Sequence, residues 1–439
     1  MNRDGFVHLC PAGHARVAAC GLALSVWLVT GCALQRASKE IQAAHQMGVV
    51  SGTVVCDGGT EQTYVLLFPV LDDEEDPKPD VAELSELQSH WAFVVHQSQR
   101  FVLGAFKDLN GNGVRDASEP AGYLGADDPL QLTAGVRISG YEIGLFPEVL
   151  SKEEFPLDKT RGDPTIQSAI HFTVGEIVTL EDERFTPERA ANGMWTPLTS
   201  IQSTGAGIYF LEPFDETRIP VLFVHGIGGS PRDLQKLIES IDRSQYEPWV
   251  YHYPSGFRLG TIARGLERTL PRLRDQLGFD SMVVIAHSMG GLVSRAAILE
   301  LGDNPETEDL VDLFVTLASP LGGHPAVKWG LKYLEHPVPA WIDIEPGSPF
   351  IESISRPLPD GLPYYLLFGF RRETSVFMQA SSDSVVPVES QLPLWAQRDA
   401  DRMWGFDTDH MEILVEGGPI STVLAILKDH ARLTQSEQP

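Results

Sequence analysis

The sequence predicts a protein of the α/β class, in which a mostly parallel sheet flanked by helices is preceded by a small all-β sandwich domain. Two patterns along the chain indicate this arrangement. In the second half, short runs of nearly continuous apolar residues alternate with helical stretches, which is typical of a parallel sheet covered on both faces. In the first half, short runs rich in β-branched and aromatic residues are separated by Gly, Pro and acidic clusters, which favours a sandwich.

The composition is that of a globular protein with an acidic surface. The chain has 439 residues, enough for two or three folding units, and 43% of them are hydrophobic. The 60 acidic residues exceed the 33 Lys and Arg residues, which gives a formal charge of −27. Because this charge would repel a phosphate backbone, we exclude nucleic acid as a partner.

Residues 1–31 are predicted to be a signal peptide. Basic residues precede an apolar stretch, Val17–Thr30, which is too short for the roughly 20 residues of a membrane-spanning helix. The stretch ends in Val-Thr-Gly-Cys at positions 29–32, which resembles a bacterial lipobox. The resemblance implies that Cys32 is the lipidated mature N-terminus of an exported, membrane-anchored lipoprotein that lies in the outer membrane or faces the periplasm. An unlipidated secretory signal or an uncleaved anchor is the alternative.

The other cysteines agree with an anchored protein that lacks disulfides. Cys10 and Cys20 lie in the predicted signal peptide, and Cys32 would be acylated, which leaves Cys56 alone. An internal disulfide is then excluded, so the exported protein would depend on its packed core.

Three segments are expected before the parallel sheet. Residues 32–47 are polar and small, and we expect a tether between the lipid and the first domain. Residues 48–146 are expected to form the β sandwich, and the Pro-rich and charged residues 147–204 a connector. The strands expected in the sandwich are Val49–Val55, Thr63–Pro69, Trp91–His96, Phe101–Phe106 and Val136–Leu145.

Residues 205–435 are expected to hold the parallel sheet and the catalytic site. Helical stretches at Leu259–Leu277 and Gly291–Leu301 separate some of the apolar runs. The strands expected here are Ile219–Val224, Trp249–Tyr253, Met282–Ala286, Leu313–Leu317 and Tyr364–Phe370.

Ser288 is the strongest candidate for a catalytic residue. It lies in the segment Ala286–Gly291, directly after an apolar strand and before a helix. In so tight a turn, small residues two positions before and after the serine avoid steric clash, and the hydroxyl projects above the sheet. The segment is therefore predicted to be a nucleophile elbow, although it has Ala286 where the usual motif has Gly.

A serine nucleophile needs a base within hydrogen-bond reach and an acid that orients the base. Both are expected downstream, in the order acid then histidine, on loops after later strands. His410 follows the last strand-like segment, so we predict that it is the base. His324 and His336 lie too early in the chain, and His430 lies near the end of an expected helix.

Asp383 is the preferred acid, because it lies on a turn after the expected strand Tyr364–Phe370. Asp407 and Asp409 are the alternatives, although they would come from the loop of the histidine itself. A loop aspartate can also simply cap a turn.

Two backbone amides are candidates for the oxyanion hole. One belongs to Met289, the residue after the nucleophile, and the other to Ile227. Ile227 lies in the segment His225–Gly229, which follows the first strong strand and whose glycines let the backbone approach a substrate closely.

With these motifs, residues from about 205 to 435 resemble a bacterial lipase or esterase of the α/β-hydrolase superfamily. The resemblance implies the α/β-hydrolase fold, acyl-enzyme chemistry on a carboxylic ester, and no cofactor for catalysis. The motifs that carry it are Val224–Gly229, Ala286–Gly291, Thr316–Pro320, and Asp383 with Val386 and Pro387.

Residues 321–363 contain many apolar side chains among prolines and glycines. In this fold such an insertion often forms a lid or an acyl pocket, and the alternative is that it packs against the domain core. An apolar surface over the site would suit a fatty acyl chain, because each buried CH₂ contributes about 0.8 kcal/mol.

A second candidate site lies in the β domain, where residues 108–119 match a twelve-position calcium loop. Oxygen-bearing side chains stand at the first, third, fifth, ninth and twelfth positions and glycine at the sixth. The flanks are not helical, so this is no EF-hand, and an Asn-Gly hairpin turn is the alternative. The predicted ligands of a structural Ca²⁺ are Asp108, Asn110, Asn112, Val114, Asp116 and Glu119.

The leading functional hypothesis is an anchored serine esterase or lipase acting on an ester or lipid substrate. A transacylase or thioesterase would use the same triad with a different acceptor or ester. The non-enzyme alternative is a calcium-stabilised surface binding protein with a decayed hydrolase domain. The sequence makes no prediction of oligomeric state.

Overall fold

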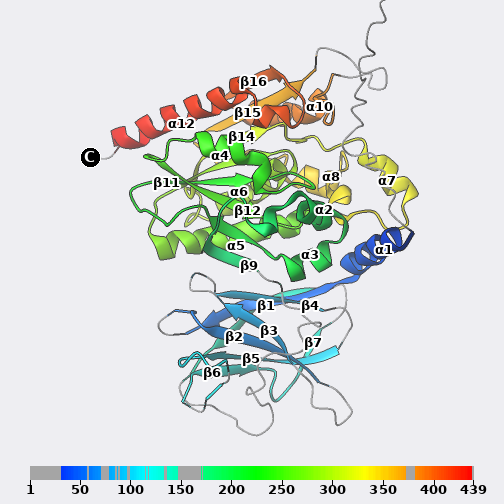
Figure 1. Ribbon diagram of the computed structural model, residues 1–439, viewed down its shortest axis with the longest axis vertical. Helices are drawn as coiled ribbons and strands as arrows, with labels where there is room; N and C mark the ends of the chain where they lie inside the picture. Colours follow the sequence, from blue (N-terminus) through cyan, green and yellow to red (C-terminus); the bar gives the residue numbers. More distant parts are fainter. Residues whose placement is uncertain are drawn as a thin grey trace, which may run out of the picture.

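The computed structural model describes residues 31–56, 59–70, 79–84, 87, 89–95, 99–113, 115–116, 118–132, 136–146, 170, 172–371 and 381–437. An N-terminal β domain lies below a larger α/β domain in Figure 1. Residues 1–30 of the predicted signal peptide lie outside the described residues. Within the described part of the chain, no helix is both long enough and apolar enough to cross a membrane.

The β domain is a sandwich of two sheets, as predicted. One sheet has the strand order β4-β1-β8 and the other the order β3-β2-β5-β6, with β7 beside β5. One hydrophobic cluster takes residues from both sheets, among them Val50, Trp91 and Leu103. The bounds are β1 Gly48–Val55, β2 Thr63–Val70, β3 Asp80–Leu84, β4 His90–Val95, β5 Gln99–Lys107, β6 Ala121–Leu124, β7 Leu130–Leu132 and β8 Arg137–Gly144.

The α/β domain is built on one sheet of eight strands in the order β16-β15-β14-β13-β11-β12-β10-β9. Neighbouring strands are parallel except for β10 and β12, which pair antiparallel. The bounds are β9 Phe172–Ile177, β10 Ala206–Phe210, β11 Ile219–Val224, β12 Tyr246–His252, β13 Met282–His287, β14 Val311–Leu317, β15 Tyr364–Phe370 and β16 Arg402–Asp407. This confirms the predicted α/β class with a mostly parallel sheet.

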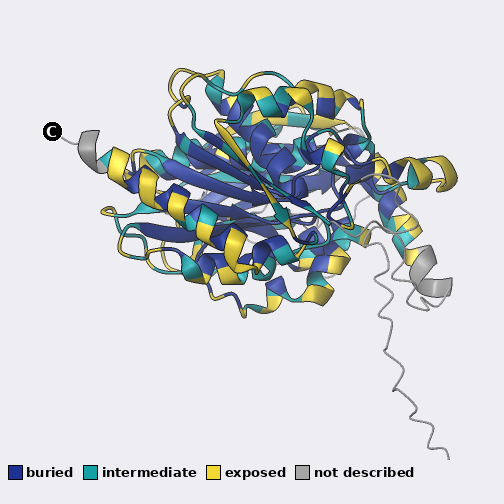
Figure 2. Ribbon diagram, turned by 90° about the horizontal axis from the view of Figure 1, so that it is seen from above, coloured by how far each residue is buried: buried dark blue, intermediate teal, exposed yellow. Residues whose placement is uncertain are grey.

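Helices cover both faces of this sheet, which explains its apolar strands. Along β11, Leu222 and Val224 belong to one buried cluster, and Val221 and Phe223 belong to the cluster on the opposite face. Figure 2 shows the buried strands enclosed by helices with exposed outer sides. The α-helices after the β domain are α2 Pro187–Trp195, α3 Pro197–Ser203, α4 Gln235–Ser240, α5 Leu259–Leu277, α6 Met289–Gly302, α7 Val327–Tyr333, α8 Pro339–Ile344, α9 Pro349–Ser353, α10 Val388–Gln391, α11 Leu394–Asp399 and α12 Gly417–Glu437. Single 3₁₀ turns are η1 Glu183–Phe185, η2 Pro231–Leu234 and η3 Glu412–Leu414.

The predicted tether, residues 32–47, is instead a helix, α1 (Gly31–Gln46), that packs against the α/β domain. Ile41, Ala44 and Met47 recur at every third position and are buried in the main hydrophobic cluster. Ile41 and Ala44 in the last turns of the helix, together with Met47 directly after it, are enough to dock a segment that also carries many polar residues. The polar composition of the segment therefore misled the sequence prediction.

The predicted connector, residues 147–204, is corrected in its second half. From Phe172 onwards it forms β9, η1, α2 and α3, and β9 is an edge strand of the large sheet beside β10. The α/β domain therefore begins before the predicted boundary at residue 205. Residues 147–169 and 171 lie outside the described residues.

Candidate active site

Ser288 lies in the turn between β13 and α6, at the carboxyl end of the central strands. Its φ of 53° and ψ of −128° form a strained backbone conformation that residues other than glycine rarely adopt. Gly290 is required nearby, because a Cβ there would lie 2.5 Å from the carbonyl oxygens of both Val224 and His225. The predicted elbow is therefore a turn pressed directly against the end of β11.

The structure brings the three predicted triad residues together from distant parts of the chain. His410 Nε2 lies 2.9 Å from Ser288 Oγ, and His410 Nδ1 lies 2.7 Å from Asp383 Oδ2. A carboxylate only accepts hydrogen bonds, so the proton is on Nδ1 and the lone pair of Nε2 faces the serine hydroxyl. All three residues are buried. This arrangement allows the imidazole to accept the proton of the hydroxyl.

The Asp383 carboxylate is fixed by its own turn. Its Oδ1 accepts hydrogen bonds from the amides of Val385, at 2.9 Å, and Val386, at 2.6 Å, which leaves Oδ2 for the imidazole. The amide of His410 also donates to the carbonyl oxygen of Asp383 over 2.9 Å. Two neighbouring loops are thereby joined at both backbone and side-chain level.

Asp409, one of the alternative acids, has a different role. Its Oδ1 accepts hydrogen bonds from the amides of Met411 and Glu412, so it caps the turn that follows the histidine. Asp407 is the last residue of β16 and is paired in register with Phe370. The geometry therefore favours Asp383 as the partner of the imidazole.

Two buried histidines that the sequence did not indicate support these loops. His287 Nε2 lies 2.9 Å from the carbonyl oxygen of His410. His324 accepts a hydrogen bond from the amide of Ala326 at Nδ1 and donates from Nε2 to the carbonyl oxygen of Val385 over 2.8 Å. Burial lowers the pKa of His287 well below its usual value and also lowers the pKa of His324, so both rings are neutral.

Gln391 is a third supporting residue that the sequence did not indicate. Its side-chain amide donates to the carbonyl oxygens of Gly369 and Val386 and accepts from the amide of Gly369. The buried side chain thus joins the end of β15 to the turn of Asp383. A glutamine with this role has no distinguishing sequence signal, because its partners are set by the folded structure.

The two predicted oxyanion donors flank Ser288 on separate segments. A Cβ on Gly226 would lie 2.8 Å from Cβ of Ser288, so the loop that carries Ile227 runs directly beside the nucleophile. Met289 begins α6, where amides have no acceptor within the helix. In the described turns and loops, the amides of Ile227 and Met289 have no backbone acceptor. Both remain candidates to bind a developing oxyanion.

The loop beside the nucleophile is held by another buried imidazole, that of His225. The ring of His225 stacks on Tyr253, with 4.2 Å between the ring centroids, and the Tyr253 hydroxyl donates to the carbonyl oxygen of His225. Burial lowers the pKa of His225 to about 4. The ring is therefore neutral at pH 7, and its role here is packing.

Residues 321–363, the predicted lid or cap, form α7, α8 and α9. Val338, Ala340 and Trp341 are buried, whereas Trp329 and Tyr333 on α7 are exposed. Part of the insertion therefore belongs to the core, and α7 projects from it. Its action as a lid stays a prediction.

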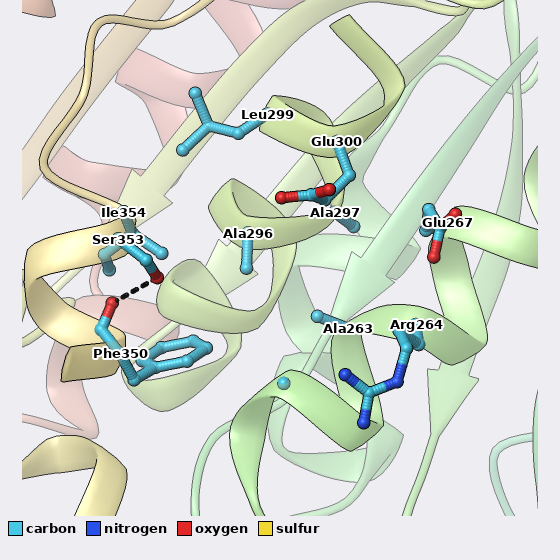
Figure 3. A pocket seen from close by; sticks show the side chains of 11 residues that line it. Ala263, Arg264, Glu267, Ala296, Ala297, Leu299, Glu300, Phe350, Ser353 and Ile354 are labelled. Atoms are coloured by element: carbon cyan, nitrogen blue, oxygen red, sulfur yellow. Dashed lines mark hydrogen bonds between the residues drawn. The ribbon is translucent and has the colours of Figure 1, made fainter. Parts of the chain in front are cut away.

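A cavity of about 290 Å³ lies between α5, α6 and α9. Its walls combine small apolar residues, such as Ala263 and Ala296, with the charged side chains of Arg264, Glu267 and Glu300 (Figure 3). None of the triad residues lines it, so it is separate from the candidate active site.

The predicted calcium loop closes through its own hydrogen bonds. The buried Asp108 carboxylate accepts from the amides of Gly111, at 2.7 Å, and Gly113, at 2.6 Å. The buried Glu119 carboxylate accepts from the amides of Leu109 and Asp116, over 2.7 and 2.8 Å. These carboxylates therefore have partners within the loop.

The positions of the remaining predicted ligands do not decide whether the loop binds calcium. The side-chain amides of Asn110 and Asn112 both donate to Asp116, over 2.5 and 3.2 Å. Val114 lies outside the described residues. Among the residues that are described, no three His, Cys, Asp or Glu side chains are grouped so as to hold a metal ion. Calcium binding stays a prediction, as does lipidation of Cys32, whose side chain is also outside the described part.

The sheet order and the turn of Ser288 at its centre define the α/β-hydrolase fold. Residues 219–335 match the family described as alpha/beta hydrolase fold, a region that runs from β11 through the elbow to α7. No curated protein matches the chain.

Several solved structures are similar to part of the chain. The mature lipase BlEst2 of Bacillus licheniformis is 17% identical, with 50% of this chain and 97% of that chain covered and a TM-score of 0.40. A putative esterase from Staphylococcus aureus is 15% identical, with 50% and 79% covered and a TM-score of 0.37. Phospholipase PlaB from Legionella pneumophila is 18% identical, with 40% and 45% covered and a TM-score of 0.32. None of these likenesses identifies a substrate.

Proposed function

We propose that the protein is a serine hydrolase that cleaves carboxylic esters through an acyl-enzyme intermediate on Ser288. The observation that carries this proposal is the hydrogen-bonded series from Ser288 Oγ through the His410 imidazole to the Asp383 carboxylate. A serine hydroxyl is a weak nucleophile until a base removes its proton, and this geometry places a base at hydrogen-bond distance.

In the first half of the reaction, Ser288 Oγ attacks the ester carbonyl carbon while His410 Nε2 takes the hydroxyl proton. The charge that develops on the carbonyl oxygen is stabilised by the amides of Ile227 and Met289, and losing one such donor typically costs about 10²- to 10³-fold in rate. The imidazolium then protonates the departing alcohol oxygen, and the acyl group remains on Oγ.

In the second half, a water molecule takes the place of the alcohol. His410 accepts a proton from the water as its oxygen attacks the acyl carbon, and the proton then returns to Ser288 Oγ as the acid leaves. Asp383 keeps the imidazole in one tautomer and stabilises its charged form throughout. The reaction requires no cofactor.

Acyl lipids are the substrate class within this proposal. The apolar side chains of residues 321–363 support it, since a lid or acyl pocket of this kind favours a long acyl chain. A transacylase or thioesterase would share the same acyl-enzyme, with another acceptor in the second half or a thioester in the first.

The nucleophile is tested by labelling with a fluorophosphonate probe and by hydrolysis of p-nitrophenyl esters of graded chain length. The wild-type chain should be labelled and Ser288→Ala should lose both labelling and hydrolysis, while circular dichroism shows the same fold. A folded Ser288→Ala variant that still hydrolyses esters would overturn the assignment. Faster turnover of long esters than of short ones supports lipids, and acyl transfer to an added alcohol in preference to water supports the transacylase.

We also propose that lipid-modified Cys32 anchors the protein to a membrane. The lipobox-like segment at positions 29–32 and the apolar stretch before it support this proposal. Cys32→Ser should move the protein from the membrane fraction to the soluble fraction, and the matched Cys56→Ser change in the β domain should not. Unchanged fractionation of Cys32→Ser would favour a different anchor.

A further inference from the structure

Helix α7 carries an exposed aromatic surface. Trp329 is 72% exposed, Tyr333 58% and Leu334 44%, and the two rings contact each other with 4.6 Å between centroids. Gly330 packs so closely on the ring of Trp341 that a Cβ there would overlap it. The helix is therefore held to the domain at Gly330 while its large aromatic side chains face solvent.

This surface is basic although the protein as a whole is strongly acidic. Between Asp312 and Glu335 the sequence has no acidic residue, in a chain whose formal charge is −27. Lys328 and Lys332 are exposed one helical turn apart, and Lys332 Nζ lies 5.1 Å from the centroid of the Tyr333 ring. Aromatic rings and ammonium groups thus occupy the same helix.

Helix α1 adds positive charge at the same end of the molecule. His45 Nε2 lies 2.8 Å from the carbonyl oxygen of Pro337, in the short segment between α7 and α8. The earlier turns of α1 carry exposed Arg36 and Lys39. Figure 1 shows α1 and α7 together at one end of the α/β domain, with the C-terminus of α12 at the opposite end.

The chemistry of this surface fits an anionic bilayer. Trp and Tyr side chains favour the level of the lipid headgroups, where the ring is buried and its polar group stays wet. Lys and Arg are attracted to anionic headgroups, by about 1 kcal/mol for each residue near the surface. A second copy that docked through the same face fits less well, because it would bring Lys328 and Lys332 of the two molecules together, and like charges repel.

We propose that α7, together with the basic turns of α1, is a face that docks on an anionic membrane surface and buries Trp329 and Tyr333 at the headgroup level. The proposal goes beyond ester hydrolysis and beyond the lipid anchor, since it concerns a contact that the folded protein itself makes. It also sets an orientation, in which the end of the molecule that carries α1 and α7 faces the bilayer.

The test uses tryptophan fluorescence of the full chain with the Cys32→Ser change, so that no attached acyl group contributes. Vesicles of phosphatidylcholine and phosphatidylglycerol carry bromine on their acyl chains, which quenches only tryptophans that lie in the bilayer. Trp329→Phe keeps an apolar ring but removes the reporter, and Trp404→Phe is the matched control, because Trp404 packs against Tyr365 on the sheet.

Brominated lipid should remove the same absolute fluorescence intensity from the parent chain and from Trp404→Phe, and the part of this loss that is due to Trp329 should be absent in Trp329→Phe. The double variant Lys328→Gln, Lys332→Gln should raise the lipid concentration for half-maximal quenching of Trp329 about thirtyfold. This factor follows because each lysine contributes about 1 kcal/mol of attraction to anionic headgroups.

The proposal is overturned if brominated lipid quenches the parent chain and Trp329→Phe equally, or quenches neither. It is also overturned if Trp329 is not quenched and sedimentation shows that the parent chain dimerises while a Trp329→Ser variant does not, since the face would then bind a second copy. The readout uses no hydrolysis, so a negative result leaves the proposed esterase activity untouched.

Discussion

The turn at Ser288 and the loop at residues 108–119 are both tight polar segments that follow a strand, and a short motif predicted a function for each. They differ in the origin of their hydrogen-bond partners. The partner of Ser288 is His410, 122 residues away, whereas the carboxylates of the loop accept from amides at most ten residues away. Local hydrogen bonds are enough to explain a turn. A turn can fold without distant side chains that converge on one hydroxyl. Their convergence on Ser288 therefore indicates a catalytic role rather than a structural one.

Among the changes that compare these two regions, the largest effect should come from removing the acid of the triad. Asp383→Asn should lower kcat about 10⁴-fold, because an amide cannot hold the imidazole in the required tautomer. Initial rates of p-nitrophenyl ester hydrolysis measure this. The matched Asp409→Asn variant should stay near wild type, since Asp409 caps a turn. If Asp409→Asn lowered kcat instead, the assignment of Asp383 as the acid of the triad would be wrong.

An intermediate effect should appear on acidification, because the surroundings of Ser288 bury imidazoles and the calcium-type loop contains none. In the folded protein the pKa of His225 is lowered to about 4, and that of His287 is also well below its usual value. An unfolded histidine has a pKa of about 6.5, so below that pH protons bind preferentially to the unfolded chain. The free energy of unfolding should therefore decrease as the pH is lowered from 6.5 toward 4. For His225 the decrease should be at most about 3 kcal/mol.

Calorimetric Tm values between pH 7.5 and 4.5 measure this decline. His225→Asn should flatten the dependence of Tm on pH, whatever its effect on Tm at pH 7.5, because it removes one of the groups that take up a proton on unfolding. The idea fails if the slope for His225→Asn equals that of the wild type.

The smallest effect concerns the calcium-type loop. If Ca²⁺ binds there, a concentration 100 times Kd stabilises the folded chain by about 2.7 kcal/mol, and the Tm of the β domain should rise and fall again with EDTA. Asp116→Asn should abolish the response with little change in shape, whereas Asp128→Ala, exposed in the same domain, should retain it. A Tm that does not respond to Ca²⁺ would leave the loop as a hairpin turn closed by its own amides.

The sequence predicted the bounds of those helices and strands whose pattern of burial is the same from one end to the other. The bounds of β11, α5 and β15 agree with the predicted strand and helix limits, because a strand buried on both faces has a continuous apolar run and a long amphipathic helix has a clear period. Asp383 and His410 could be found because chain order restricts them to loops after particular strands.

Other features could not be found in this way, since tertiary contacts define them. Helix α1 has few apolar residues, and its docking depends on α3 and α8. His324 was set aside because it lies too early in the chain, yet it contacts the loop of Asp383 across 61 residues of sequence. Gln391 looks like any surface glutamine until the fold buries it.

The docked helix α1 changes how far the protein can move from its own N-terminus. Sixteen residues of extended chain would reach about 55 Å, whereas the same residues as a helix span about 24 Å. Because α1 is also fixed to the α/β domain, a group attached at Cys32 would hold that domain at one height and one angle. Under the proposed anchoring, the site around Ser288 would therefore stay at one height above the bilayer, and it would reach other regions only as the whole protein moved laterally.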